Sequence, residues 1–175
     1  MNSADFRQQI NSLRPSYMSE RKPLMELLSK KGGTKGEYTS FGPFYQTYMY
    51  AFFIGYQNGE RLPLSGKKDN FFVIGEWKPK NIVDFILMLL FTNLDELKDW
   101  NALENLGENE IDKKISELQT AMEEYANAGL LYLQDKYDNE RFEFQDPFVF
   151  ANILNSLQKP DSIKTKSSKK SKSAT

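Results

Sequence analysis

Residues 110–137, with the sequence EIDKKISELQTAMEEYANAGLLYLQDKY, decide the fold class of this chain. Apolar and small side chains recur there at alternating spacings of four and three residues, which is the repeat of one face of an α-helix. At 1.5 Å per residue the stretch predicts a helix about 40 Å long, the longest element of the protein. The face consists of Ile111, Ile115, Leu118, Met122, Tyr125, Gly129 and Tyr132.

Gly129 lies in the interior of this predicted helix, where glycine costs about 1 kcal/mol relative to alanine. Together with Ala126 and Ala128 it forms a smooth patch on which a second helix can approach closely. The second helix belongs either to the same chain or to a partner, and we favour a bundle formed within the chain.

Residues 38–56 form the most aromatic segment, with nine Phe or Tyr among nineteen residues. Polar positions between 44 and 56 are too few and too irregular for a half-exposed strand, so this part predicts a buried helix that ends at Asn58-Gly59. Proteins that stack nucleic-acid bases interleave aromatic side chains with Lys or Arg, and residues 38–56 contain neither. We interpret the segment as core or as a protein interface.

The remaining patterns predict a mainly α fold, a compact helical bundle with one long helix (about 110–137) and at most a minor β-hairpin near 71–77. The strand candidate is the sequence FFVIGEW at 71–77. Asp146-Pro147 is a typical helix start and opens a helix that runs to about residue 158. Further helices are predicted at 4–13, 23–31, 81–91 and 94–103.

Charge divides the chain into three parts. Residues 1–37 carry seven basic against four acidic side chains, residues 38–158 carry ten against nineteen, and residues 159–175 carry six against one. We therefore predict a basic N-terminal helical arm (1–37), an acidic helical core domain (38–158) and a disordered tail rich in Lys and Ser (159–175).

The chain of 175 residues contains no Cys and no His. This excludes disulfides, zinc fingers, thiol nucleophiles and catalysis by histidine. We expect no enzyme activity, no metal and no cofactor.

No segment predicts a membrane protein. The longest apolar run, 82–91, contains Asp84 and covers about half of a membrane span. The first ten residues lack the apolar stretch of a signal peptide, so we expect a cytoplasmic protein with no membrane partner.

Asp69, Glu76 and Lys78 are the strongest candidates for catalysis. A Mg²⁺-dependent nuclease needs paired carboxylates and a lysine near the attacking water, and residues two apart on a strand point to the same side. The Glu-x-Lys pattern is very common, however, and the sheet that such nucleases require is missing. A charge pair at the end of a strand is the favoured interpretation, and the nuclease is the least favoured function.

Two lysine-rich segments are candidates for nucleic-acid binding. The loop after the second predicted helix lacks the order of a nucleotide-binding P-loop but is able to contact anions. The tail is able to attract a nucleic-acid backbone without reading its sequence. A nucleic-acid-binding protein that uses this loop and the tail is therefore the alternative function. The candidate residues are Lys30, Lys31, Lys35, Lys164, Lys166, Lys169, Lys170 and Lys172.

Two motifs give the chain a resemblance to a known family. The first is FYQTYMYAFFIGYQNGERLPL at 44–64, and the second is EYANAGL at 124–130. Together they resemble the small accessory proteins found with bacterial DNA phosphorothioation (Dnd-type) and related anti-phage defence clusters. The resemblance covers roughly residues 41 to 135.

The resemblance implies a non-enzymatic accessory subunit of a DNA-targeting defence system, whose partner is a larger ATPase or nuclease subunit. Its motifs describe a helix end, a turn and a helix-packing glycine, so they carry over no catalytic residue. Arg61 either braces the turn or contacts a partner, and the sequence leaves both roles open. The residues expected to bind the partner are Tyr45, Tyr48, Phe52, Tyr56 and Arg61.

Overall fold

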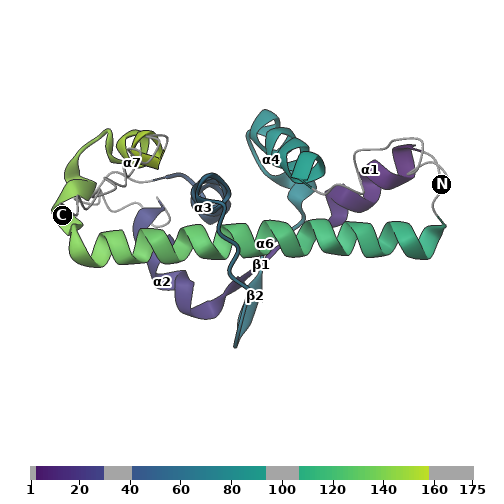
Figure 1. Ribbon diagram of the computed structural model, residues 1–175, viewed down its shortest axis with the longest axis horizontal. Helices are drawn as coiled ribbons and strands as arrows, with labels where there is room; N and C mark the ends of the chain where they lie inside the picture. The colour runs from purple at the N-terminus through teal and green to yellow at the C-terminus, as the bar shows by residue number, and fades with distance from the viewer. Residues whose placement is uncertain (1–2, 30–40, 94–106, 158–175) are drawn as a thin grey trace, which may run out of the picture.

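The computed structural model describes residues 3–29, 41–93 and 107–157, and its longest element is the helix α6 (Glu108–Asn139). With 32 residues this helix is about 48 Å long and spans the molecule (Figure 1). Its first turn is capped by the Glu110 carboxylate, which accepts a hydrogen bond from the Gly107 N–H over 3.0 Å. The predicted long helix and the mainly α fold class are confirmed.

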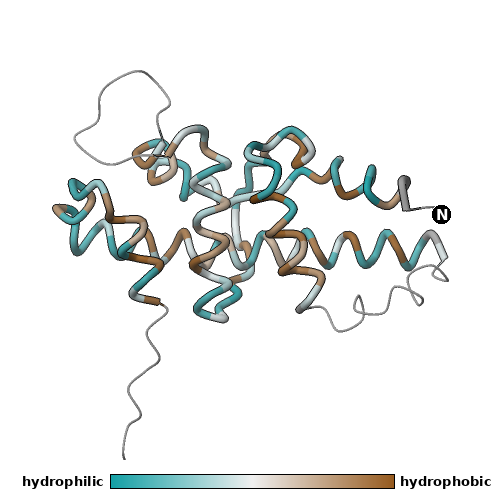
Figure 2. The backbone as a smooth tube through the Cα atoms, turned by 90° about the horizontal axis from the view of Figure 1, so that it is seen from above, coloured by the Kyte–Doolittle hydropathy of each residue, from teal (hydrophilic) through white to brown (hydrophobic). Residues whose placement is uncertain are grey.

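Helix α3 (Phe44–Asn58) crosses α6 near its middle, as the view from above in Figure 2 shows. The two backbones touch there, because a Cβ atom on Gly129 would lie 1.8 Å from the Ala51 carbonyl oxygen. A Cβ atom on Gly55 would lie 2.0 Å from the Tyr125 carbonyl oxygen. Gly129 therefore serves the close approach of a helix, and this helix belongs to the same chain.

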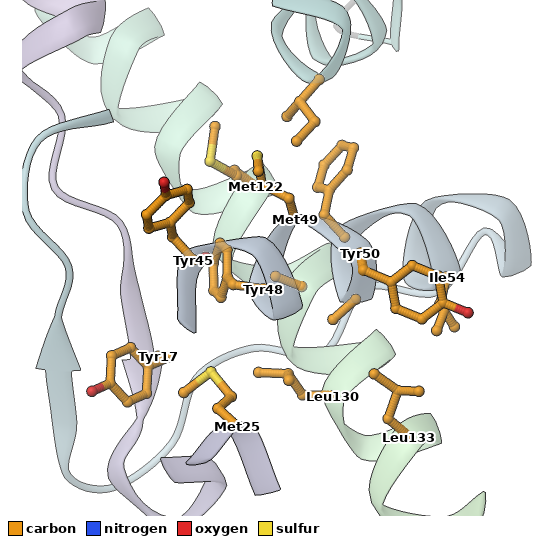
Figure 3. Packing of buried hydrophobic residues seen from close by; sticks show 14 of the residues in the cluster. Tyr17, Met25, Tyr45, Tyr48, Met49, Tyr50, Ile54, Met122, Leu130 and Leu133 are labelled. Atoms are coloured by element: carbon orange, nitrogen blue, oxygen red, sulfur yellow. The ribbon is translucent and has the colours of Figure 1, made fainter. Parts of the chain in front are cut away.

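The aromatic helix α3 forms the centre of the core. Tyr48 is 1% exposed and packs edge-on against Trp77, while Phe52 is 0% exposed. Side chains from α3 meet others from β1, α2 and α6, as Figure 3 shows for Tyr17, Met25, Met49, Met122 and Leu130. The helix ends at Gly59, whose φ of 68° is in the left-handed region that glycine adopts without strain.

The N-terminal elements pack against the bundle. They are α1 (Ser3–Ser12), β1 (Ser16–Met18), the 3-10 turn η1 (Ser19–Arg21) and α2 (Lys22–Leu28). Tyr17, Leu24 and Met25 are buried in the main cluster. The buried Glu123 of α6 accepts a hydrogen bond from the Ser16 N–H over 2.8 Å. Residues 16–28 therefore pack into the bundle.

The predicted strand at 71–77 is wrong. The strand β2 (Lys68–Asn70) precedes it and pairs antiparallel with β1, with Tyr17 opposite Asp69. Residues 74–76 form the 3-10 turn η2 (Ile74–Glu76). The physical reason is the spacing of Phe71, Ile74 and Trp77, which are all buried and lie three residues apart, the period of a 3-10 helix rather than of a strand.

The remaining described elements are α4 (Lys80–Asn93), the 3-10 helix η4 (Arg141–Gln145) and α7 (Val149–Leu157). The Asp146 side chain accepts a hydrogen bond from the Phe148 N–H over 2.9 Å, which confirms it as the cap before α7. The helix predicted at 94–103 lies outside the described residues. Among the helices that the structure describes, none is long and apolar enough to cross a membrane.

Candidate interaction site at the crossing of helices α3 and α6

The two motifs that carried the family resemblance meet in space. The turn that follows α3 lies along α6, and the Leu62 N–H donates a hydrogen bond to the Glu124 carbonyl over 3.1 Å. The Asn127 amide donates back to the carbonyl oxygens of Leu62 and Pro63 over 3.1 and 3.4 Å. Residues 59–64 and 124–129 therefore form one structural unit.

Arg61 is fixed at the surface of this unit. Its Nε donates to Glu124 Oε2 over 2.8 Å, and its second guanidinium contact to the same oxygen is 2.7 Å long. The guanidinium carbon lies 5.7 Å from the centre of the Tyr125 ring, within the range of a cation–π contact. The Arg61 side chain stays 42% exposed. It both braces the turn and offers a positioned guanidinium to the solvent.

Beneath Arg61 lies an aromatic support. The rings of Tyr56 and Tyr125 are 5.4 Å apart, and Phe52 stacks on Tyr56 at 5.7 Å. Tyr56 and Tyr125 are half-buried, whereas Phe52 is part of the core. The surface around Arg61 is thus continuous with the interior of the bundle, which restrains its movement.

A shallow depression of about 370 Å³ adjoins Arg61 on the N-terminal side of Glu124. Its lining residues all end in polar or charged groups, and the charges are of both signs. Lys113 Nζ lies 3.9 Å from the Glu117 carboxylate, and the Thr120 hydroxyl donates to the Ser116 carbonyl over 2.9 Å. The lining residues are Arg61, Lys113, Ser116, Glu117 and Thr120. We call Tyr56, Arg61, Glu124, Tyr125 and this lining the Arg61 site.

Only two of the five predicted partner-binding residues reach the surface, Tyr56 and Arg61. The composition of α3 explains the burial of the other three, because a helix that is apolar on nearly all sides is covered on nearly all sides.

 The side chains of Tyr45, Tyr48 and Phe52 are all buried, and the Tyr48 hydroxyl donates to the Ser16 carbonyl over 3.2 Å. Burial, with a smaller contribution from Glu123, raises the pKa of Tyr48 well above its usual value.

The lysines predicted to contact nucleic acid all lie outside the described residues, in the segments 30–40 and 158–175. Their role stays a prediction.

The structure does not place Asp69, Glu76 and Lys78 on one strand. Asp69 lies in β2 opposite Tyr17, Glu76 lies in the 3-10 turn η2, and Lys78 follows that turn. Glu76 and Lys78 therefore do not share one side of a strand. Within residues 3–29, 41–93 and 107–157, no group of three or more Asp or Glu side chains is arranged to hold a metal ion.

Sequence reasoning missed Glu124, Tyr125 and the lining of the depression as parts of the site. Glu124 and Tyr125 did stand in the second motif, five and four residues before the helix-packing Gly129. The sequence offered one signal for Glu124. Arg61 stands in the first motif and Glu124 in the second, and an arginine and a carboxylate on two contacting elements readily form an ion pair. Nothing comparable marks Ser116 or Thr120.

Comparisons with known proteins give one match. The family model for DNA sulphur modification system-associated protein 4 matches residues 18–171, a longer stretch than the motifs alone had indicated. No curated protein and no solved structure matches the chain. The chain thus belongs to the family of DNA sulphur modification system-associated protein 4.

Proposed function

We propose that this protein is a non-enzymatic accessory subunit of a bacterial DNA-targeting anti-phage defence system, and that its Arg61 site binds a larger ATPase or nuclease subunit. One observation supports this above all: residues of both motifs hold Arg61 in a fixed position while leaving its side chain 42% exposed. Family membership supplies the context of a DNA sulphur modification system.

The chemistry of the site favours a protein partner. Arg and Tyr are enriched among the residues that dominate protein–protein binding energy. Arg61 is held by Glu124 and by the Tyr125 ring, so it loses less conformational freedom when a partner binds. The neighbouring depression adds hydroxyl groups and charges of both signs, which suit the polar rim of an interface.

The same chemistry disfavours DNA as the direct ligand of this site. Glu117 and Glu124 lie beside the basic side chains, and residues 38–158 together carry a net charge of −9. A phosphate backbone is repelled by such a surface. We therefore assign DNA recognition to the partner, while the basic tail remains the candidate for non-specific DNA contact.

The composition supports a role without catalysis. With neither His nor Cys, the chain lacks the two side-chain types most often used as general base and thiol nucleophile.

A pull-down of the tagged full-length chain from its native host tests the proposal. It is performed at low salt, with and without nuclease treatment, and analysed by mass spectrometry. We expect ATPase or nuclease subunits to be retained after nuclease treatment. Arg61→Glu should reduce their recovery about tenfold or more, whereas Arg7→Glu, which reverses an exposed arginine on α1, should leave it unchanged.

Three results would contradict the proposal. The first is recovery of the chain alone. The second is loss of all partners on nuclease treatment, which would favour direct DNA binding through the tail. The third is equal recovery with Arg61→Glu and with the unmodified chain.

A further inference from the structure

A second unusual surface lies beyond the C-terminal end of α6. Phe142 is 84% exposed and Phe148 is 69% exposed, the two highest values among the large apolar side chains of the described residues. The segment 141–148 lies between α6 and α7, at the opposite end of the molecule from α1 (Figure 1). It begins more than 20 Å along α6 from Glu124, by a rise of about 1.5 Å per residue, and is therefore separate from the Arg61 site.

Both exposed rings are carried by an anchored backbone. Phe144 is 0% exposed and packs edge-on against Tyr137 at 5.2 Å. Asp146 fixes the start of α7, because its carboxylate accepts hydrogen bonds from the Phe148 N–H and from the Asn152 amide. The exposure of Phe142 and Phe148 therefore does not result from a poorly packed segment. A surface that is already in place binds a partner at a lower entropic cost.

The sequence around these rings is acidic. From residue 135 to residue 146 there are five carboxylates against Lys136 and Arg141, a net charge of −3. Lys136 forms ion pairs with both Glu140 and Glu143. The hydrogen bond from Lys136 is the main cause that lowers the pKa of Glu140. Glu140 therefore keeps its negative charge at neutral pH.

This combination selects one class of partner. Nucleic acids and anionic membranes carry negative charge and are repelled by the carboxylates. A protein segment with apolar side chains flanked by Lys or Arg complements both features, because its apolar groups cover the rings and its cations approach the carboxylates.

We propose that Phe142 and Phe148, with the carboxylates of Asp138, Glu140 and Glu143, form a docking surface for a basic, apolar segment of a partner protein. We call these five residues the Phe142 surface. The inference does not depend on the Arg61 site, because a chain with a defective Arg61 site still carries this surface.

The test uses a labelled amphipathic peptide with leucines on one face and lysines on the other, titrated into the full chain and followed by fluorescence anisotropy. Phe142→Ser/Phe148→Ser should weaken binding about tenfold or more. The matched control is Phe85→Ser/Met88→Ser on α4, which removes two other exposed apolar side chains and should leave binding unchanged. A peptide with Glu in place of Lys should bind at least about tenfold more weakly than the lysine peptide.

Equal affinity of the Phe142→Ser/Phe148→Ser variant and the unmodified chain would overturn the proposal, as would equal binding of the Glu peptide. Two further results would assign the surface to other occupants and so overturn it. If serine in place of the tail lysines raises the peptide affinity, the chain's own tail occupies the surface. If sedimentation shows a dimer that only Phe142→Ser/Phe148→Ser dissociates, a second copy occupies it. The substituted lysines are Lys164, Lys166, Lys169, Lys170 and Lys172.

Discussion

Two regions of the molecule differ in the exposure of their apolar side chains. These side chains are buried where α3 crosses α6, and two of them are exposed at the C-terminal end of α6. At the crossing, Gly55 and Gly129 let two backbones touch, and the aromatic side chains around them close the core. At the end of α6, Phe144 is buried while Phe142 and Phe148 face the solvent. Because the buried residue anchors its exposed neighbours, the difference reflects the direction of each side chain rather than the quality of packing. Buried contacts at the crossing stabilise the bundle, whereas the exposed side chains at the end of α6 are available to bind a partner.

The largest expected effect on the free energy of unfolding belongs to Phe144, which is buried although Phe142, two residues before it, is exposed. Phe144→Ala should lower the free energy of unfolding by about 3–5 kcal/mol, because it removes a fully buried ring that packs against Tyr137 and Phe150. Chemical denaturation followed by circular dichroism measures this loss. A loss below about 1 kcal/mol would mean that the end of α6 is not anchored as described.

Gly129→Ala should reverse the usual sign of a glycine-to-alanine change in a helix. Alanine normally stabilises a helix interior by about 1 kcal/mol. Here the added Cβ would lie 1.8 Å from the Ala51 carbonyl oxygen, a backbone atom, so we expect a net loss of about 1–3 kcal/mol in the free energy of unfolding. An increase in the midpoint of thermal unfolding would contradict the contact between the two backbones.

A hydrogen bond between the two regions should make the protein sensitive to alkali. The Tyr50 hydroxyl of α3 donates to the Phe150 carbonyl of α7 over 2.7 Å, and burial is the main cause that raises its pKa above the usual value of 10.0. The folded chain thus keeps a proton that the unfolded chain releases above about pH 10. Stability is therefore present below pH 10 and falls as the pH rises further, by up to about 1.4 kcal/mol per pH unit for this group.

Unfolding midpoints measured between neutral and alkaline pH check this prediction. Tyr50→Phe removes the titrating hydroxyl and should flatten the alkaline decline, even though it also removes one hydrogen bond. An unchanged slope in Tyr50→Phe would rule out Tyr50 as the cause.

The smallest expected effect belongs to the exposed rings. Phe142→Ala should change the free energy of unfolding by less than about 0.5 kcal/mol, because the ring is 84% exposed and contributes little to the core. The same denaturation assay measures it beside Phe144→Ala. Similar losses of unfolding free energy in Phe142→Ala and Phe144→Ala would contradict the difference in burial between the two rings.

The helices were predictable because their signals are local. The face that contains Ile111 and Gly129 repeats within a single segment, and the C-terminal end of α3 and the start of α7 carry their own capping residues. The sheet was not predictable from local signals, since β1 and β2 are each three residues long and pair across 50 to 54 positions of sequence. The buried triplet Phe71, Ile74 and Trp77 resembles a strand in composition, although its spacing of three is that of a 3-10 turn.

The candidate site was predictable only in part. Arg61 and Tyr56 stood in a motif and lie at the surface. The burial of Tyr48 and Phe52 could not be predicted from the sequence. Helix α3 is apolar on nearly every side, and such a pattern does not distinguish core residues from interface residues. The ion pair with Glu124 depends on the contact between two distant segments, which the sequence does not encode locally.

The most direct test of the central claim exchanges the two charges of the ion pair. Arg61→Glu/Glu124→Arg keeps a salt bridge between the turn and α6 but moves the guanidinium from the turn to the helix. We expect an unfolding midpoint close to that of the unmodified chain, together with loss of the defence-system subunits in the native-host pull-down. Full recovery of those subunits with the exchanged pair would contradict the account, because it would show that Arg61 only braces the turn.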